Sequence, residues 1–153
     1  MPLREHRFFR DPPDPVRDGE YINFPLWPES RYLVRMAKNP DAQQTVLEIA
    51  LAIPDTEIVR VHEDVLEIAL ALSPEMAARF VAQAKSWVLS PYELLLPEKI
   101  GDLIIHLAGG GQGEAAWDLT GAALALQPDP RAAEKEEEEF YSPEPQPLFE
   151  KWY

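Results

Sequence analysis

One eight-residue phrase occurs twice in this chain: VLEIALAI at residues 46–53 returns as VLEIALAL at residues 65–72. The copies start at residues 46 and 65, only 19 residues apart, whereas helical-hairpin repeats recur about every 34 to 47 residues. Each copy is therefore too close to the other to stand for a whole hairpin. We predict that they lie on neighbouring helices, the second helix of one hairpin and the first helix of the next.

The second copy has the pattern of a helix with one apolar side. At about 100° per residue, one side collects Val61, Val65, Ile68, Ala69 and Leu72, and the other side collects Glu63, Asp64 and Glu67. We expect Leu66 and Ile68 to be buried against flanking helices. The repeated phrase is then a packing stripe.

Two helix start signals bracket this region. Asn39-Pro40-Asp41 and Ser73-Pro74-Glu75 each combine an N-cap side chain, a proline in the first turn and an acid at the positive end of the helix dipole. They are 34 residues apart (39 to 73), and a third helix start is expected near Gly113-Glu114. This spacing is typical of helical hairpins. It predicts the helix pairs 28–38 with 40–53, 60–72 with 74–89, and 97–108 with 113–126.

The third pair contains the segment IIHLAGGGQGEAAWDLTGAALALQPDP, which resembles a tetratricopeptide repeat. Gly111 matches the turn between the helices, Ala116 and Ala123 match the small residues at helix contacts, and Pro128 closes the unit. Ile104 and Thr120 depart from that pattern, where a small and a large residue are usual. The first two pairs are more similar to HEAT or armadillo hairpins. The resemblance implies a helical superhelix that presents a surface to another protein.

The chain divides into three parts. Residues 1–27 contain DPPDP and FPLWP, and their prolines favour an extended arm whose aromatic side chains pack on the domain. Residues 28–127 form the helical-repeat domain, and residues 128–153 form an acidic, proline-rich tail or the start of a further element. We therefore expect an all-α fold, a right-handed α-α superhelix of about three hairpins with an extended N-terminal arm.

The two ends of such a stack need covers. The N-terminal arm is one candidate, and the other is the set of large C-terminal side chains Phe140, Tyr141, Leu148, Phe149, Trp152 and Tyr153. A chain ending in FEKWY also suggests a protein that continues past Tyr153. Within the helices, we expect Tyr32, Phe80, Trp87 and Trp117 to belong to the core.

Composition narrows the function classes. The chain has no cysteine, which removes disulfides and thiolate nucleophiles, and no apolar run approaches the roughly 20 residues of a membrane span. The formal net charge of −13 disfavours a nucleic-acid partner, because phosphates would be repelled. These features predict a soluble, cytoplasmic protein, with no cofactor and no membrane partner, and Glu136 to Glu139 are expected to be solvated.

Two groups of residues could carry chemistry. His62, Glu63 and Glu67 could offer two metal ligands from one helix side, but no second histidine is near in sequence and His62 turns toward the apolar side. Asp102 and His106 have the i, i+4 spacing of an acid–base dyad and equally of an ordinary surface pair. We favour the structural explanation for both groups. The glycines at 109–111 follow a helix and lack a phosphate-loop lysine, so they indicate a helix C-cap and turn.

A protein-interaction function fits these observations best. In a hairpin stack the first helices lie side by side, so their polar sides should form one surface. The expected partner-binding residues are Arg31, Arg35, Glu63, Glu67, Asp102 and His106. The sequence thus predicts a scaffold or regulatory module, not an enzyme, whose partner is another protein or peptide segment. One alternative is a small metal-dependent or acid–base hydrolase that uses His62, Glu63, Glu67, Asp102 and His106. The other alternative is a self-assembling element without an outside partner.

Overall fold

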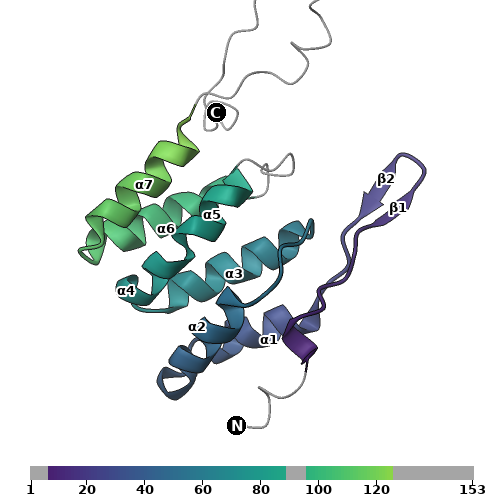
Figure 1. Ribbon diagram of the computed structural model, residues 1–153, viewed down its shortest axis with the longest axis horizontal. Helices are drawn as coiled ribbons and strands as arrows, with labels where there is room; N and C mark the ends of the chain where they lie inside the picture. The colour runs from purple at the N-terminus through teal and green to yellow at the C-terminus, as the bar shows by residue number, and fades with distance from the viewer. Residues whose placement is uncertain (1–6, 89–95, 126–153) are drawn as a thin grey trace, which may run out of the picture.

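The structure is a computed structural model that describes residues 7–88 and 96–125 (Figure 1). It is an all-α fold with one short two-stranded sheet. The α-helices are α1 (Pro28–Met36), α2 (Gln43–Leu51), α3 (Val59–Ala71), α4 (Pro74–Ala77), α5 (Val81–Val88), α6 (Pro97–Gly109) and α7 (Gly113–Ala123). Short 3₁₀ turns cover Arg7–Phe9, Pro40–Ala42 and Ala78–Phe80. The handedness of a superhelix stays a prediction.

The predicted start signals act as caps. The Asn39 side chain accepts a hydrogen bond from the backbone N–H of Asp41 at 3.1 Å, and Ser73 accepts one from Met76 at 3.4 Å. In both segments the first turns are irregular: Pro40–Ala42 is a 3₁₀ turn before α2, and Ala78–Phe80 is a 3₁₀ turn between α4 and α5. The predicted helix 40–53 therefore begins as a 3₁₀ turn and ends at Leu51, and the predicted helix 74–89 is interrupted at Ala78–Phe80. The start at Gly113 is confirmed.

The predicted neighbours α2 and α3 pack against each other, and α3 lies between α1 and α6 (Figure 1). Leu66 and Ile68 are fully buried, as expected, and so is the apolar stripe of α3. Phe80 from the 3₁₀ turn, Leu103 of α6 and Leu119 of α7 extend the same core. The first helices of the three predicted hairpins are thus side by side, and the core runs through the whole stack.

The N-terminal arm differs from a simple extended segment. Strands β1 (Val16–Asp18) and β2 (Tyr21–Asn23) pair antiparallel, with Val16 opposite Asn23 and Asp18 opposite Tyr21. Gly19 supports the connecting turn with a φ of +60°, a conformation that glycine adopts without strain. Phe9 and Trp27 are buried, as a packed arm requires, but Tyr21 is 81% exposed. The hairpin projects from the helices (Figure 1), and Arg17 of β1 pairs with Glu57, in the segment between α2 and α3, at 3.4 Å.

The glycine-rich turn between α6 and α7 is a helix C-cap, as predicted. Gly111 has a φ of +79°, and the N–H of Gln112 donates to the carbonyl of Leu107 at 2.9 Å. Gly110 lies against α4: a Cβ at this position would come within 2.1 Å of the Pro74 ring. The backbone of this turn therefore packs directly against Pro74 at the start of α4.

Several predictions concern residues outside the described ranges. These are the helix ends at 89 and 126, the acidic tail 128–153 with Glu136 to Glu139, and the proposed C-terminal cover from Phe140 to Tyr153.

Candidate functional site

A charged strip crosses the stack where α1, α3 and α6 lie side by side. Arg31 of α1 donates from Nη1 to Oδ1 of Asp64 at 2.6 Å and to Oε2 of Glu67 at 3.2 Å. Lys99 of α6 donates to the other oxygen of Glu67 at 2.8 Å. Two of the predicted partner-binding residues, Arg31 and Glu67, are thus joined in one network that links three helices.

Asp64 is the residue of this strip whose burial the sequence did not predict. It was expected on the polar side of α3, yet it is buried, with its side chain only 5% exposed. Helix α1 covers it, and the Ser30 hydroxyl donates to its Oδ2 at 2.5 Å. The physical reason is that a helical wheel shows which side of α3 is polar but not that α1 packs on part of that side. Asp64 is a structural anchor between α1 and α3.

The strip shifts the protonation equilibria of its members. The hydrogen bond from Lys99 lowers the pKa of Glu67, assisted by the positive charge of Arg31. Burial raises the pKa of Glu63, which is half-buried on the same side of α3. The hydrogen bond to Asp64 raises the pKa of Arg31. All three directions follow from local burial and pairing, and they do not distinguish a catalytic from a structural role.

The other predicted partner-binding residues have separate environments. Arg35 and Asp102 are exposed. The His106 ring does not pair with Asp102 in the described structure; its Nε2 lies 2.9 Å from the carbonyl oxygen of Leu72 and ties α6 to the end of α3. The i, i+4 pair that the sequence suggested is therefore not formed. In the described residues no group of three or more His, Asp or Glu side chains could hold a metal ion.

His62 is almost completely buried, at 3% exposure, which confirms that it turns toward the apolar side of α3. Its ring stacks on the Trp87 ring with centroids 4.4 Å apart and an angle of 13° between the planes. Its Nε2 lies 2.8 Å from the carbonyl oxygen of Thr56. The histidine therefore fastens the connection between α2 and α3 to α5.

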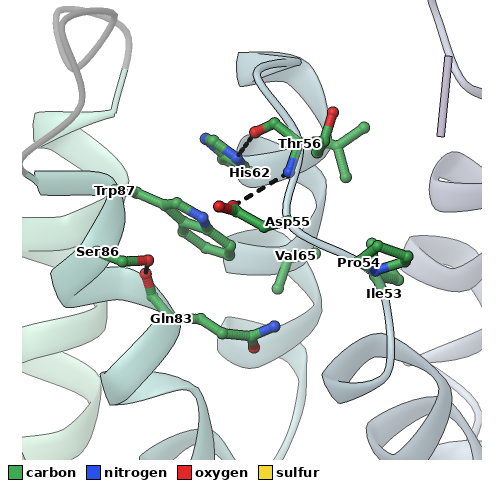
Figure 2. A pocket seen from close by; sticks show the side chains of 10 residues that line it. Ile53, Pro54, Asp55, Thr56, His62, Val65, Gln83, Ser86 and Trp87 are labelled. Atoms are coloured by element: carbon green, nitrogen blue, oxygen red, sulfur yellow. Dashed lines mark hydrogen bonds between the residues drawn. The ribbon is translucent and has the colours of Figure 1, made fainter. Parts of the chain in front are cut away.

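A cavity of about 120 Å³ lies beside this stacked pair (Figure 2). Figure 2 shows that its walls come from the α2–α3 connection, the start of α3 and helix α5. The lining residues are Ile53, Pro54, Asp55, Thr56, Val61, His62, Val65, Gln83, Ser86 and Trp87. Two buried polar atoms of these residues, Nδ1 of His62 and Oε1 of Gln83, have no hydrogen-bond partner within the described structure.

The burial of His62 predicts a pH-dependent stability. Desolvation lowers its pKa below the ordinary value of 6.5, although the Thr56 carbonyl and the Asp55 charge oppose this effect. The unfolded chain therefore binds this proton more readily than the folded protein does. The stabilisation is complete above pH 6.5 and is lost as the pH falls from 6.5 through the lowered pKa.

Urea unfolding between pH 5 and pH 7.5 measures this effect. We expect the free energy of unfolding to fall with decreasing pH by at most about 1.4 kcal/mol per unit from this group. A His62→Phe variant keeps a ring against Trp87 and should lose that part of the slope, while carboxylates titrate alike in both proteins. Equal slopes for the two proteins would show that His62 titrates alike in the folded and unfolded chains.

The outer face of α6–α7 was not expected from the sequence. We use this name for Gly101 and Ile105 of α6, Trp117 and Gly121 of α7, and Leu124, which directly follows α7. Trp117, predicted in the core, is 80% exposed, and Ile105 is 71% exposed. The prediction for Trp117 is wrong because Ala116, Leu119 and Ala123 already fill the buried side of α7. A helical wheel drawn through those three residues would have placed Trp117 outside.

Contacts on the flanks show that these residues share one side of the hairpin. Lys99 and His106 lie on the flank of α6 that faces α3. Asp118 lies on the flank of α7 that faces α5, where it forms a 2.6 Å ion pair with Lys85. The remaining side of each helix, next to their mutual contact, carries Ile105 and Trp117. Each lies four residues from the glycine that borders the turn, Gly109 or Gly113, so both are about one helical turn from the connection.

Compared with protein-family models, curated proteins and solved structures, the chain shows no match. Within the described ranges, no helix has both the length and the apolar character that crossing a membrane requires.

Proposed function

We propose that this protein is an interaction module of a larger assembly, built from helical hairpins, and that the outer face of α6–α7 is its docking surface. The observation that carries the proposal is the pair Trp117 and Ile105, both large, apolar and exposed, and each about one helical turn from the connection of one hairpin. Exposed tryptophan is typical of the residues that dominate binding energy at protein interfaces. Single exposed apolar residues are common, whereas this one hairpin exposes three large ones, Ile105, Trp117 and Leu124.

Glycines support this assignment. Gly101 and Gly121 lie inside helices, where glycine costs about 1 kcal/mol relative to alanine. A Cβ at either position would meet nothing within 4 Å in the described structure, so the observed packing does not require glycine there. A helix of a partner could approach the backbone closely at these positions, each one turn beyond Ile105 or Trp117 from the α6–α7 connection.

Charge indicates the chemistry of the partner. Glu98 and Asp102 of α6 and Glu114 of α7 are exposed around the outer face, and the whole chain carries −13. A partner helix with an apolar side flanked by Lys or Arg would complement this rim. A second copy of the chain would bring the same acids, and the C-terminal sequence is itself acidic, so both are disfavoured as occupants. We therefore assign the face to a basic amphipathic helix of another protein.

The charged strip is the weaker candidate surface. Arg31 and Glu67, central to the predicted partner site, already satisfy each other within the network. Arg35 is exposed and makes no ion pair within the described part of the chain, so it is the member still open to an acidic partner. A partner that responds to Arg35→Glu and not to Trp117→Ala would select the strip instead.

Trp117→Ala tests the docking surface. Proteins captured by the full-length chain from its source cells are identified, purified and measured directly by calorimetry with wild type and variants. We expect Trp117→Ala to weaken the binding free energy of a genuine partner by about 2 kcal/mol or more, because a central tryptophan is lost. This loss corresponds to an increase in Kd of about thirtyfold or more. The matched control is Tyr21→Ala, because Tyr21 is equally exposed, at 81%, but lies on the β1–β2 hairpin. Partners that bind both variants equally would refute the docking surface.

Two further measurements separate the other occupants. Sedimentation of the wild type and the Trp117→Ala variant reports self-association: a dimer that the variant abolishes would make a second copy the occupant. Removal of residues 126–153, followed by NMR of the Trp117 indole N–H, tests whether the C-terminal tail binds the outer face. A changed resonance would make the tail the occupant. Each of these results contradicts the assignment to another protein.

Gly121→Ala gives a prediction with opposite signs for stability and binding. We expect the variant to be more stable than wild type by up to about 1 kcal/mol in urea unfolding, because alanine is the better helix former and its Cβ meets open space. It should bind the partner more weakly, because the Cβ keeps the partner backbone away. Stabilisation without weaker binding would mean that the partner does not pack at Gly121.

A further inference from the structure

The cavity beside His62 and Trp87 is larger than a buried water requires. A single water needs roughly 10 to 15 Å³ of such volume, whereas this cavity has about 120 Å³. It lies between α3 and α5 and is independent of the outer face of α6–α7. A cavity of this size between packed helices has room for several heavy atoms of a small ligand.

Two buried, unpaired side-chain atoms of the lining residues are acceptors. The Thr56 carbonyl can only accept, so Nε2 of His62, at 2.8 Å, carries the proton in their hydrogen bond. The neutral imidazole then leaves a lone pair on Nδ1. This atom and Oε1 of Gln83 are the two buried side-chain atoms without partners in the described structure. Burying unpaired acceptors is costly. Both atoms are buried out of reach of water, so a small rotation of either side chain would bring its acceptor to an N–H group of a ligand in the cavity.

Charge and aromatic character select a cation among such ligands. The Asp55 carboxylate projects toward Trp87 in Figure 2, and it accepts the Thr56 N–H at 3.1 Å. None of the described lining residues is Lys or Arg, so an anion would have no counter-charge. An indole ring also attracts cations. We propose that the cavity binds a small cationic group that donates N–H hydrogen bonds, an alkylammonium or a guanidinium.

The geometry suggests how such a group would be held. Ile53, Pro54 and Val65 supply an apolar wall for the carbon atoms of the ligand. Asp55, from the α2–α3 connection, supplies the counter-charge, and Gln83, from α5, supplies an acceptor. Binding would thus connect α5 to the α2–α3 connection, which His62 and Trp87 already join by stacking.

NMR on the full-length protein tests the proposal. The Trp87 indole N–H and the ring nitrogens of His62 are followed during titration with propylammonium, methylguanidinium, propionamide and propionate. We expect saturable shifts of both residues with the two cations, at least tenfold weaker binding of uncharged propionamide, and no shifts with propionate. Asp55→Asn and Gln83→Leu should each weaken binding of the cations about tenfold.

Matched controls keep the result interpretable. Asp41→Asn and Gln44→Leu change exposed residues of the same types away from the cavity and should leave the titration unchanged. Thermal unfolding of every variant establishes that it is folded at the temperature of the titration. A blocked arginine amide and a blocked lysine amide distinguish the source: saturable binding means that a protein side chain can enter, and its absence means that the ligand is a free small molecule.

Three results would overturn the proposal. The first is the absence of a saturable shift at Trp87 and His62 with both cations. The second is equal affinity for propionamide and propylammonium, which would remove the requirement for charge. The third is unchanged binding in both Asp55→Asn and Gln83→Leu, which would place the cation outside the cavity.

Discussion

Truncation of Leu66 to alanine is expected to lower the free energy of unfolding by about 2 to 5 kcal/mol. Leu66 is fully buried in α3, the helix that lies between α1 and α6. Removing its side-chain atoms leaves a cavity, because the packed neighbouring helices cannot move in to fill it. Ile68→Ala should cost a similar amount, because Ile68 is equally buried in the same helix. Urea unfolding followed by circular dichroism at 222 nm measures both values.

Glu63→Ala is the control for these truncations. Glu63 belongs to the same helix but is half-exposed, and burial already disfavours its charged form, so its removal should change the stability by no more than about 0.5 kcal/mol. The contrast tests the orientation of α3. Similar losses for Leu66→Ala and Glu63→Ala would mean that the helix presents a different side to the core.

Truncation of Arg31 to alanine is expected to destabilise the fold by about 1.5 to 3 kcal/mol, an unusually large value for an arginine whose side chain is 55% exposed. The cause lies in its partner. Asp64 is only 5% exposed and would keep Ser30 as its remaining hydrogen-bond donor, so a buried carboxylate would be left without its counter-charge. Water can reach the exposed side of the site, which keeps the loss below that of a fully buried pair.

Arg35→Ala is the matched control, because Arg35 lies one turn later on the same helix and is also exposed. It should change the stability by less than about 0.5 kcal/mol. A double-mutant cycle of Arg31→Ala with Asp64→Ala should give a coupling energy of at least about 0.5 kcal/mol. Equal losses for Arg31→Ala and Arg35→Ala, together with no coupling, would show that the ion pair contributes nothing to the fold.

The two arginines illustrate what local sequence can and cannot reveal. Both occur on the polar side of α1, and by sequence alone they were equivalent candidates for partner binding. In the folded protein Arg31 holds Asp64 and Glu67, whereas Arg35 stays exposed without an ion pair in the described structure. The difference arises from the position of α3 under α1, which brings together residues more than 30 positions apart.

Features with local causes were predictable. Asn39 and Ser73 cap their helices because a side chain two or three residues before an unpaired backbone N–H can reach it in any fold. The turn at Gly111 needs a positive φ, and glycine supplies it. The burial of Leu66, Ile68 and His62 followed from the period of an amphipathic helix.

Features decided by packing between helices were not predictable. A helical wheel defines the sides of a helix but not which neighbour covers each side, so the sequence placed Asp64 on the polar side of α3 without predicting its burial, and placed Trp117 in the core. The cavity likewise exists because α5 brings Gln83 and Trp87 against the α2–α3 connection, residues about 30 positions apart in sequence. The sequence by itself determined the helices, their caps and their apolar stripes, because these depend on interactions within a few residues. Only the tertiary structure decided the charged strip, the cavity and the outer face of α6–α7, because each depends on which helix sides remain uncovered after the helices pack.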